Sequence, residues 1–173
     1  MGRARRFLSR LGERGSATIE FAVIGTSYML MLLAAFEFGY MVFIQSVLDN
    51  SARAAARLIR TGQVQSSGNP TGTFQTLLCS TVGSVVPCAS IVYQAQVYAN
   101  WTLAQTAVNT PPTRDVNGNY ISAGFSSGTA GQIVVVQVTY NYPFVTPWIG
   151  GLVGNGKGSS FLMSTVIFKN EPF

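Results

Sequence analysis

The sequence of 173 residues contains no histidine. The commonest general base and the commonest metal ligand are therefore both absent, and neither a Ser-His-Asp nor a Cys-His arrangement can be built. The acidic residues Asp49, Asp115 and Glu171 are scattered and form no acid/base pair in sequence. The sequence therefore predicts a protein that is not an enzyme and has no catalytic, cofactor-binding or metal-ligating residues.

Charged residues are also scarce, at 10% of the chain, against about a quarter in typical soluble domains. The net charge of +5 comes mostly from the first fifteen residues, where five arginines (Arg3, Arg5, Arg6, Arg10 and Arg14) outweigh the single Glu13 and leave +4. The remainder carries only about +1, too little for a basic face that binds nucleic acid. Because short basic segments beside an apolar run stay in the cytoplasm, this charge predicts membrane topology.

Only two cysteines occur, Cys79 and Cys88, with eight residues between them that include Gly83 and Pro87. A loop of this composition can close, so in an exported domain the pair favours a disulfide. The alternative is two free, buried thiols.

A lone carboxylate, Glu20, stands at the start of the longest apolar run, which extends from Phe21 to Ile44 and is interrupted by charge only at Glu37. At 1.5 Å per residue these positions make a helix of about 36 Å, enough to cross a hydrocarbon core of about 30 Å. A carboxylate at the centre of such a span costs about 2.5–3.5 kcal/mol, and less near the interface. The basic leader ending in Gly15, followed by Glu20, resembles a prepilin processing site.

From Ser16 to about Gly62 the sequence predicts one continuous helix without proline. Beyond Gln45 it becomes amphipathic, with an alanine-rich stripe at helical spacing that should pack on another element. Arg53, Arg57 and Arg60 share another face. These arginines either form a solvated face or pair with a partner's carboxylate or a lipid phosphate.

The rest of the chain predicts a small domain over residues 63–173. We expect a short helix over 73–82, strands over 90–98, 132–142 and 161–168, and loops over 110–131 and 143–158. The fold class is therefore α+β: a long N-terminal membrane-spanning helix followed by a small domain whose antiparallel sheet packs on the emergent helix.

The segment from Gly151 to Gly158 nearly spells a phosphate-binding loop, but glycine replaces the serine or threonine that would hold magnesium. We interpret it as a flexible loop and predict no small-molecule substrate.

Three stretches resemble the N-terminal domain of the TadE-like family, minor pilins or pseudopilins of the tight-adherence (Flp) pilus. They are Arg-Gly15-Ser-Ala-Thr-Ile-Glu20-Phe21-Ala22, then Phe36-Glu37-Phe38-Gly39-Tyr40, and then the run from Leu48 to Arg57. The run from Val134 to Tyr140, the Tyr142-Pro143 and Thr146-Pro147 pairs, the cysteine spacing and the ending Asn170-Glu171-Pro172-Phe173 also look like this family. Residues 100–131 match no motif.

The resemblance implies a chain inserted in the inner membrane, with its leader (1–15) in the cytoplasm, a helix over 16–62 and an outer domain over 63–173. A prepilin peptidase would cut between Gly15 and Ser16, and the Glu20 carboxylate would neutralise the new amine of a neighbouring subunit. Other pilin subunits are the implied partners, with Glu37, Arg53 and Arg57 as possible contacts. Phe21 stands where the major Flp pilins usually have tyrosine, which favours a minor component.

Two alternatives remain. The chain could be an uncleaved, membrane-anchored periplasmic binding or scaffold domain, in which Glu20 is only a hydrated interface residue. It could also be a type II secretion pseudopilin or an ordinary type IV pilin, which the Glu37-Phe38-Gly39 stretch and the Asn-Glu-Pro-Phe ending argue against.

Overall fold

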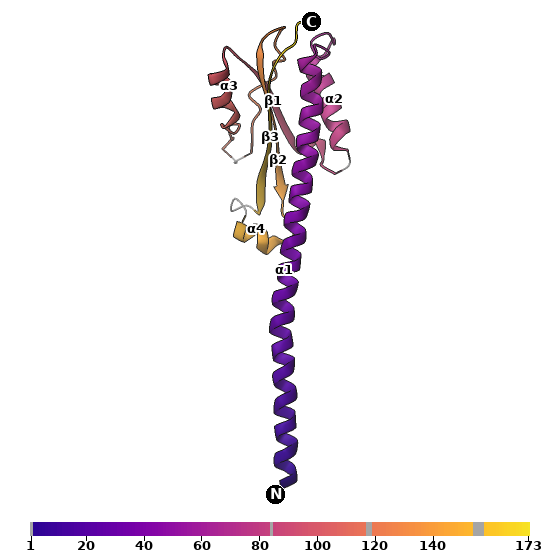
Figure 1. Ribbon diagram of the computed structural model, residues 1–173, viewed down its shortest axis with the longest axis vertical. Coiled ribbons are helices and arrows are strands. Elements are labelled where there is room, and N and C mark those ends of the chain that lie inside the picture. Colours follow the sequence, from indigo (N-terminus) through magenta and orange to yellow (C-terminus); the bar gives the residue numbers. More distant parts are fainter. Residues whose placement is uncertain (1, 84, 117–118, 154–157) are drawn as a thin grey trace. The chain divides into compact units, whose positions relative to one another are not determined.

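A computed structural model describes residues 2–83, 85–116, 119–153 and 158–173, with side chains from Ser16 onward. The chain forms two compact units, one up to Gly39 and one over Tyr40–Phe173. Figure 1 shows the long N-terminal helix and the sheet with its shorter helices, in agreement with the predicted α+β class.

The long helix α1 runs over Gly2–Arg60, 59 residues. It confirms the helix predicted from Ser16 and extends it through the basic leader, where no proline interrupts a composition rich in arginine and leucine, both good helix formers. The helix ends as expected at Gly62, whose φ of 78° suits glycine best. There the Gly62 N–H donates to the Ile59 carbonyl at 3.1 Å and the Gln63 N–H to the Leu58 carbonyl at 3.0 Å.

The first unit exposes its apolar side chains. Phe21, Ile24 and Phe36 are 78%, 69% and 75% exposed. Among the described residues, Ser16–Arg60 is the one helix long and apolar enough to cross a membrane, with a mean hydropathy of 1.8 over its most apolar stretch. An exposed apolar surface of this extent is stable in lipid rather than in water, so the helix is the single-pass membrane anchor of the chain.

The second unit is built on a three-stranded antiparallel sheet in the order β1-β2-β3. Strand β1 covers Ile91–Tyr98, β2 Ile133–Pro143 and β3 Ser159–Lys169, which confirms all three predicted strands within two residues at each end. Ile91 pairs with Tyr140 at one end of the β1–β2 ladder, and Pro143 pairs with Ser159 at the end of the β2–β3 ladder. Both faces of central β2 are buried from Ile133 to Tyr140, which explains a β-branched run from Ile133 to Thr139 that only Gln137 interrupts.

One face of the sheet packs against α1, as predicted, and also against α2. Leu48, Ala52, Ala55 and Ile59 of α1 are fully buried in one cluster with alternate β2 residues, Val134, Val136 and Val138. Helix α2 covers Pro70–Val82, three residues longer than predicted, because the Asn69 side chain accepts a hydrogen bond from the Gly72 N–H at 3.0 Å and Pro70 opens the helix. Its Phe74, Leu78 and Val82 complete the core.

The opposite face is partly covered by α3 (Trp101–Val108), in a region where the sequence showed no motif. Asn100 caps this helix by accepting from the Leu103 N–H at 2.9 Å. Ala104 is fully buried and packs with Ile133 and Val135 of β2. The predicted polar loop over 110–131 follows it. Its expected turn at 117–118 lies outside the described residues, but the Asp115 N–H donates to the Asn119 carbonyl at 2.8 Å across it.

The loop predicted over 143–158 is wrong for Pro147–Val153, which form helix α4. Proline at the first position of a helix is pre-organised rather than disruptive. Gly150, read as a breaker, is needed for packing: a Cβ there would lie 3.0 Å from the Gly158 Cα and 3.1 Å from the Phe144 Cβ. Residues 154–157, the centre of the loop that resembles a phosphate-binding motif, lie outside the described residues.

The predicted disulfide joins Cys79 near the end of α2 to Cys88, which starts the short 3₁₀ turn η1 (Cys88–Ser90) before β1; their Cα atoms are 5.5 Å apart. It ties α2 to the edge strand of the sheet.

Cys79→Ser is expected to lower the free energy of unfolding by about 2–3 kcal/mol, since the bond constrains the unfolded chain. Denaturant unfolding of the purified full chain without reductant measures this. The double variant Cys79→Ser/Cys88→Ser should match the single one, because the bond and not either thiol carries the effect. Complete thiol labelling of unfolded, unreduced wild-type protein would contradict the prediction.

Candidate functional site

The predicted processing junction lies inside α1. The backbone is helical through Gly15 and Ser16, and the Ser16 hydroxyl donates to the Glu20 Oε1 at 3.1 Å. The two predicted residues are therefore neighbours on one helix face, since positions four apart lie one turn from each other. A peptidase that binds an extended substrate must first unwind the helix here, and Gly15 lowers the cost of that step because glycine is about 1 kcal/mol poorer than alanine in a helix.

Beyond the junction, the first unit presents a continuous apolar surface. Phe21 is 78% exposed, and the absence of a side chain at Gly25 leaves a shallow depression beside its ring. This depression, about 510 Å³, is lined by Phe21, Ala22, Gly25, Thr26, Tyr28, Met29 and Leu30, so threonine and tyrosine hydroxyls are its only polar side-chain groups. The surface can be covered by lipid chains or by apolar side chains of another helix.

Glu37 differs from Glu20. It is only 5% exposed, whereas Glu20 is exposed, and it interacts with another group of the chain. The structure therefore does not bring Glu20 and Glu37 together. The Glu37 side chain is not freely available to contact another subunit.

The arginines of α1 have two environments. Arg53 and Arg57 are exposed, whereas Arg60 forms an ion pair with Glu171, with 3.0 Å between Nη2 and Oε1. The side chains of this pair are 55% and 48% exposed, so the pair contributes at most about 1 kcal/mol. Pairing of Arg60 with a carboxylate was one of the two predicted alternatives, but the carboxylate belongs to this chain.

The ending Asn170-Glu171-Pro172-Phe173 closes over the end of α1. The Glu171 N–H donates to the Arg60 carbonyl at 3.0 Å, and the buried Asn170 amide donates to the carbonyls of Ser127 and Thr129, both at 3.0 Å. The Phe173 ring covers Gly62, where a Cβ would lie 2.7 Å from its Cδ1 and Cδ2 atoms. We call residues 170–173 the closing segment; it satisfies a carbonyl that a helix end leaves free.

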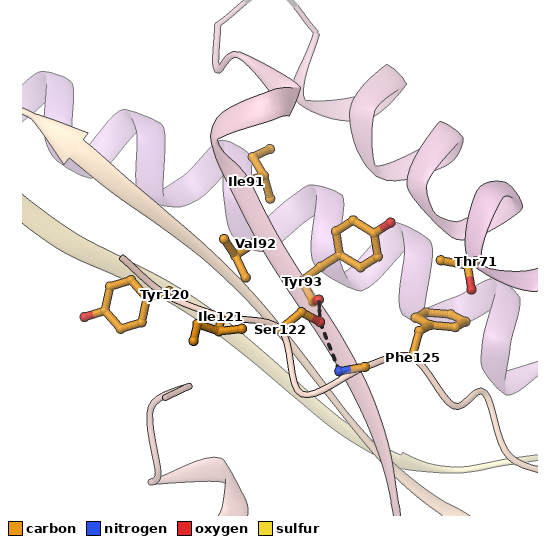
Figure 2. Close-up of a pocket in the computed structure, with 9 residues that line it drawn as sticks. Thr71, Ile91, Val92, Tyr93, Tyr120, Ile121, Ser122 and Phe125 are labelled. Atoms are coloured by element: carbon orange, nitrogen blue, oxygen red, sulfur yellow. Dashed lines mark hydrogen bonds between the residues drawn. The ribbon is translucent and has the colours of Figure 1, made fainter. Parts of the chain in front are cut away.

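A groove of about 540 Å³ lies along the outer edge of β1 (Figure 2), between Ile91, Val92 and Tyr93 on one side and Tyr120, Ile121 and Ser122 on the other. Ser122 holds the loop at the strand: its hydroxyl donates to the Tyr93 carbonyl at 2.7 Å and accepts from the Gly124 N–H at 3.2 Å. Burial raises the pKa of the Tyr93 phenol, which donates to the Gln75 side chain at 3.1 Å.

Tyrosines are the only ionisable residues among those that line the groove. The folded chain therefore disfavours deprotonation of Tyr93. The neutral phenol contributes fully to the stability of the fold at neutral pH, and this contribution is lost only above pH 10.

Sequence reasoning missed a second surface feature, a stack on the side of the sheet that α3 faces. The Arg114 guanidinium carbon lies 4.3 Å from the centre of the Tyr120 ring, and that ring stacks on Phe161 at 4.1 Å. Arg114 also donates to the Tyr120 hydroxyl. Because these residues come from a loop and a distant strand, no spacing along the sequence could have indicated the stack.

A comparison with known protein families gives a match, and it lies within helix α1. Residues 15–57 match the family model described as TadE-like protein. No curated protein and no solved structure matches the chain. The matched segment begins at Gly15 and covers the Ser16–Glu20 pair, the apolar run and most of the stripe that packs on the sheet. It confirms the predicted resemblance over this segment, which is similar to the TadE-like family, a structural family associated with the Tad pilus.

Proposed function

We propose that this chain is a minor pseudopilin of a Tad (Flp) pilus, inserted in the inner membrane and cut after Gly15 by a prepilin peptidase. The observation that carries the proposal is the position of the Ser16–Glu20 pair. It lies at the first residues of the family match and at the start of the exposed apolar stretch of α1. A carboxylate in this position is costly in lipid, and a role in assembly accounts for it.

Two observations support a cytoplasmic leader and an outer domain. Five arginines precede the apolar run, and basic flanks stay on the cytoplasmic side. The domain on the other side contains the Cys79–Cys88 disulfide, a bond that persists in oxidising compartments and is rare in the cytoplasm.

Cleavage changes the chemistry of the Glu20 environment. In the uncut chain Glu20 accepts a hydrogen bond from the Ser16 hydroxyl. Hydrolysis of the Gly15–Ser16 bond creates a positively charged amine at Ser16, close to the same carboxylate. When helices pack in an apolar filament core, each amine and each carboxylate must be paired, because an unpaired buried charge is strongly destabilising. If the Ser16 amine of one subunit pairs with the Glu20 carboxylate of its neighbour, both charges are neutralised. The same pairing fixes the axial offset between the two helices.

The remaining partners follow from this role. The exposed apolar surface of α1, with its depression at Gly25, packs on helices of other pilin subunits, and exposed Arg53 and Arg57 face their outer domains. The sheet domain then determines which subunits can be neighbours.

Intact mass tests the proposal. In cells with an active prepilin peptidase, the membrane-bound chain is expected to begin at Ser16. Gly15→Ala should be cut, whereas Gly15→Leu should accumulate uncut, because a bulky side chain blocks an active site that accepts an extended backbone. Gly25→Leu is the matched control and should be processed normally, since Gly25 lies ten residues further along the same helix.

Recovery of only full-length wild-type chain would favour the second candidate, an uncleaved membrane-anchored periplasmic binding or scaffold domain. One observation favours it: α1 is helical without interruption through the junction.

A further inference from the structure

Helix α4 exposes a cluster of large apolar side chains. Val145, Leu152 and Val153 are 74%, 76% and 58% exposed, and Trp148 is 44% exposed. Trp148 and Leu152 lie one turn apart on α4, Val145 lies just before the helix, and residues 144–153 include no charged side chain. Single exposed apolar residues are ordinary, but a contiguous cluster marks a contact surface.

The position of α4 on the domain is fixed. Its other face is buried, with Ile149 3% exposed and Gly150 in close contact with Phe144 and Gly158. The Phe144 N–H donates to the Gly158 carbonyl at 3.1 Å, which closes the base of the connection between β2 and β3. Because the inner face cannot turn outward without breaking these contacts, the cluster points away from the domain.

Within the second unit, α4 lies at the end of the sheet where α1 enters the core (Figure 1). The ring of Tyr142, at the end of β2, is 6.1 Å from that of Tyr40 on α1 and 5.6 Å from that of Phe144, which precedes α4. Tyr40 and Phe43 are 45% and 50% exposed, and Ile44 is the first α1 residue buried in the core. The apolar run of α1 thus ends at the level of α4.

We propose that α4 is a second membrane contact of this chain: a short helix that lies in the interfacial region of the leaflet on the domain's side, with Trp148 at headgroup depth and Leu152 and Val153 among the acyl chains. Tryptophan concentrates at membrane interfaces, and helices with one apolar face lie in this plane. The proposal rests on the membrane anchor and not on cleavage or on a role in pili.

Lipid fits this surface better than a protein partner. The last residues of the apolar run, 40–44, belong to the same compact unit as α4, and Tyr40 lies close to Tyr142 at the end of the sheet beside α4. The cluster consists of four side chains, far fewer than the roughly 20–30 residues a side of a stable protein interface. Residues 144–153 are uncharged, so they supply no ion pair that would select a particular protein partner.

The chain contains its own control for a test. Its two tryptophans are almost equally exposed, Trp148 at 44% and Trp101 at 48%. Trp101 follows β1, which ends opposite Ile133, whereas α4 follows the other end of β2 at Pro143. At about 3.3 Å per residue, β2 separates these ends by roughly 30 Å. With α4 at the bilayer, we therefore expect Trp148 and not Trp101 to contact lipid.

The test uses the full chain in phosphatidylcholine vesicles whose acyl chains are brominated near the headgroup. The variant Trp101→Phe reports on Trp148, and Trp148→Phe reports on Trp101. Trp148 is expected to emit at shorter wavelength in vesicles than Trp101 and to lose most of its fluorescence to the bromines, while Trp101 keeps its own. Adding Leu152→Glu to the Trp101→Phe chain should reduce the quenching of Trp148. Val116→Glu, at a position 101% exposed, should leave it unchanged.

Equal quenching of the two tryptophans in a vesicle-bound chain would overturn the membrane contact of α4 and leave the anchor intact. A blue shift of Trp148 that requires raised protein density, without quenching by bromines, would assign the surface to a second copy and also overturn it. Failure of the chain to remain with the vesicles would remove the anchor and the proposal together.

Discussion

Glu20→Val is expected to leave the chain in the membrane and to abolish its assembly with other subunits. Removal of the carboxylate eases insertion, by less than the about 2.5–3.5 kcal/mol that a charge costs at the centre of a span. Assembly suffers because a buried amine loses its partner, at about 3–5 kcal/mol, on the order of a hundredfold or more in the subunit equilibrium. Carbonate extraction measures insertion, and the yield of sheared pili from cells that carry only the variant measures assembly.

Two further variants separate the charge from the hydrogen bond. Glu20→Gln keeps the size of the side chain and an oxygen that can accept from Ser16, but it has no charge, and it should fail in assembly as Glu20→Val does. Thr26→Val removes a polar group from the same exposed helix surface and should assemble normally. Normal pilus yield from Glu20→Val would reduce Glu20 to a hydrated interface residue.

Gly62→Val is expected to destabilise the sheet domain strongly. A β-branched residue at a φ of 78° is strained, by about 1–2 kcal/mol, and its Cβ would displace the Phe173 ring. Displacement of the ring also loosens the closing segment, which includes Glu171, the ion-pair partner of Arg60. The total should reach about 2–4 kcal/mol, and a thermal melt of the detergent-solubilised chain should show a midpoint lower by several degrees.

Gly68→Ala is the matched control, because nothing lies within 4 Å of a Cβ at Gly68; it should change the midpoint little. A double-mutant cycle tests the contact itself. If Gly62 and Phe173 are coupled, Gly62→Ala costs less in a Phe173→Ala chain than in the wild type. If the free-energy changes of the two substitutions are strictly additive, backbone strain alone accounts for the loss of stability at Gly62.

The parts of the fold that could be predicted are those with a local signal. Helix α1 is marked by composition and lacks proline up to Gly62, and β2 is marked by its β-branched run. The C-terminal end of α1 and both ends of β2 were therefore predicted nearly correctly, whereas the helix begins at Gly2 and not at Ser16. The stripe of small residues from Ala52 to Ile59 predicted the packing of helix on sheet, because its period leaves one face for the core. The Ser16–Glu20 contact also follows from the sequence, since residues four apart meet on a helix.

The parts that were missed depend on contacts between distant segments. Helix α3 is short and is held by Ala104 against the far face of the sheet, a burial that its own eight residues do not encode. Helix α4 was hidden because Pro147 and Gly150 resemble breakers, and only the close approach of Phe144 explains Gly150. The contact of residues 170–173 with the end of α1 could not be predicted, because Arg60 and Glu171 lie far apart in the sequence.

The stripe of α1 that lies in the domain core has a mechanical consequence. Ile44 and Ile59 bound a buried stretch of one helix, about 22 Å long at 1.5 Å per residue. The same unbroken helix continues into the apolar segment, so tension on that segment acts along the helix axis. Such a load acts on all the contacts of the buried stretch together. At a free strand edge, in contrast, the contacts would break one after another. We therefore expect the force that separates α1 from the sheet to depend on the length of this buried stretch.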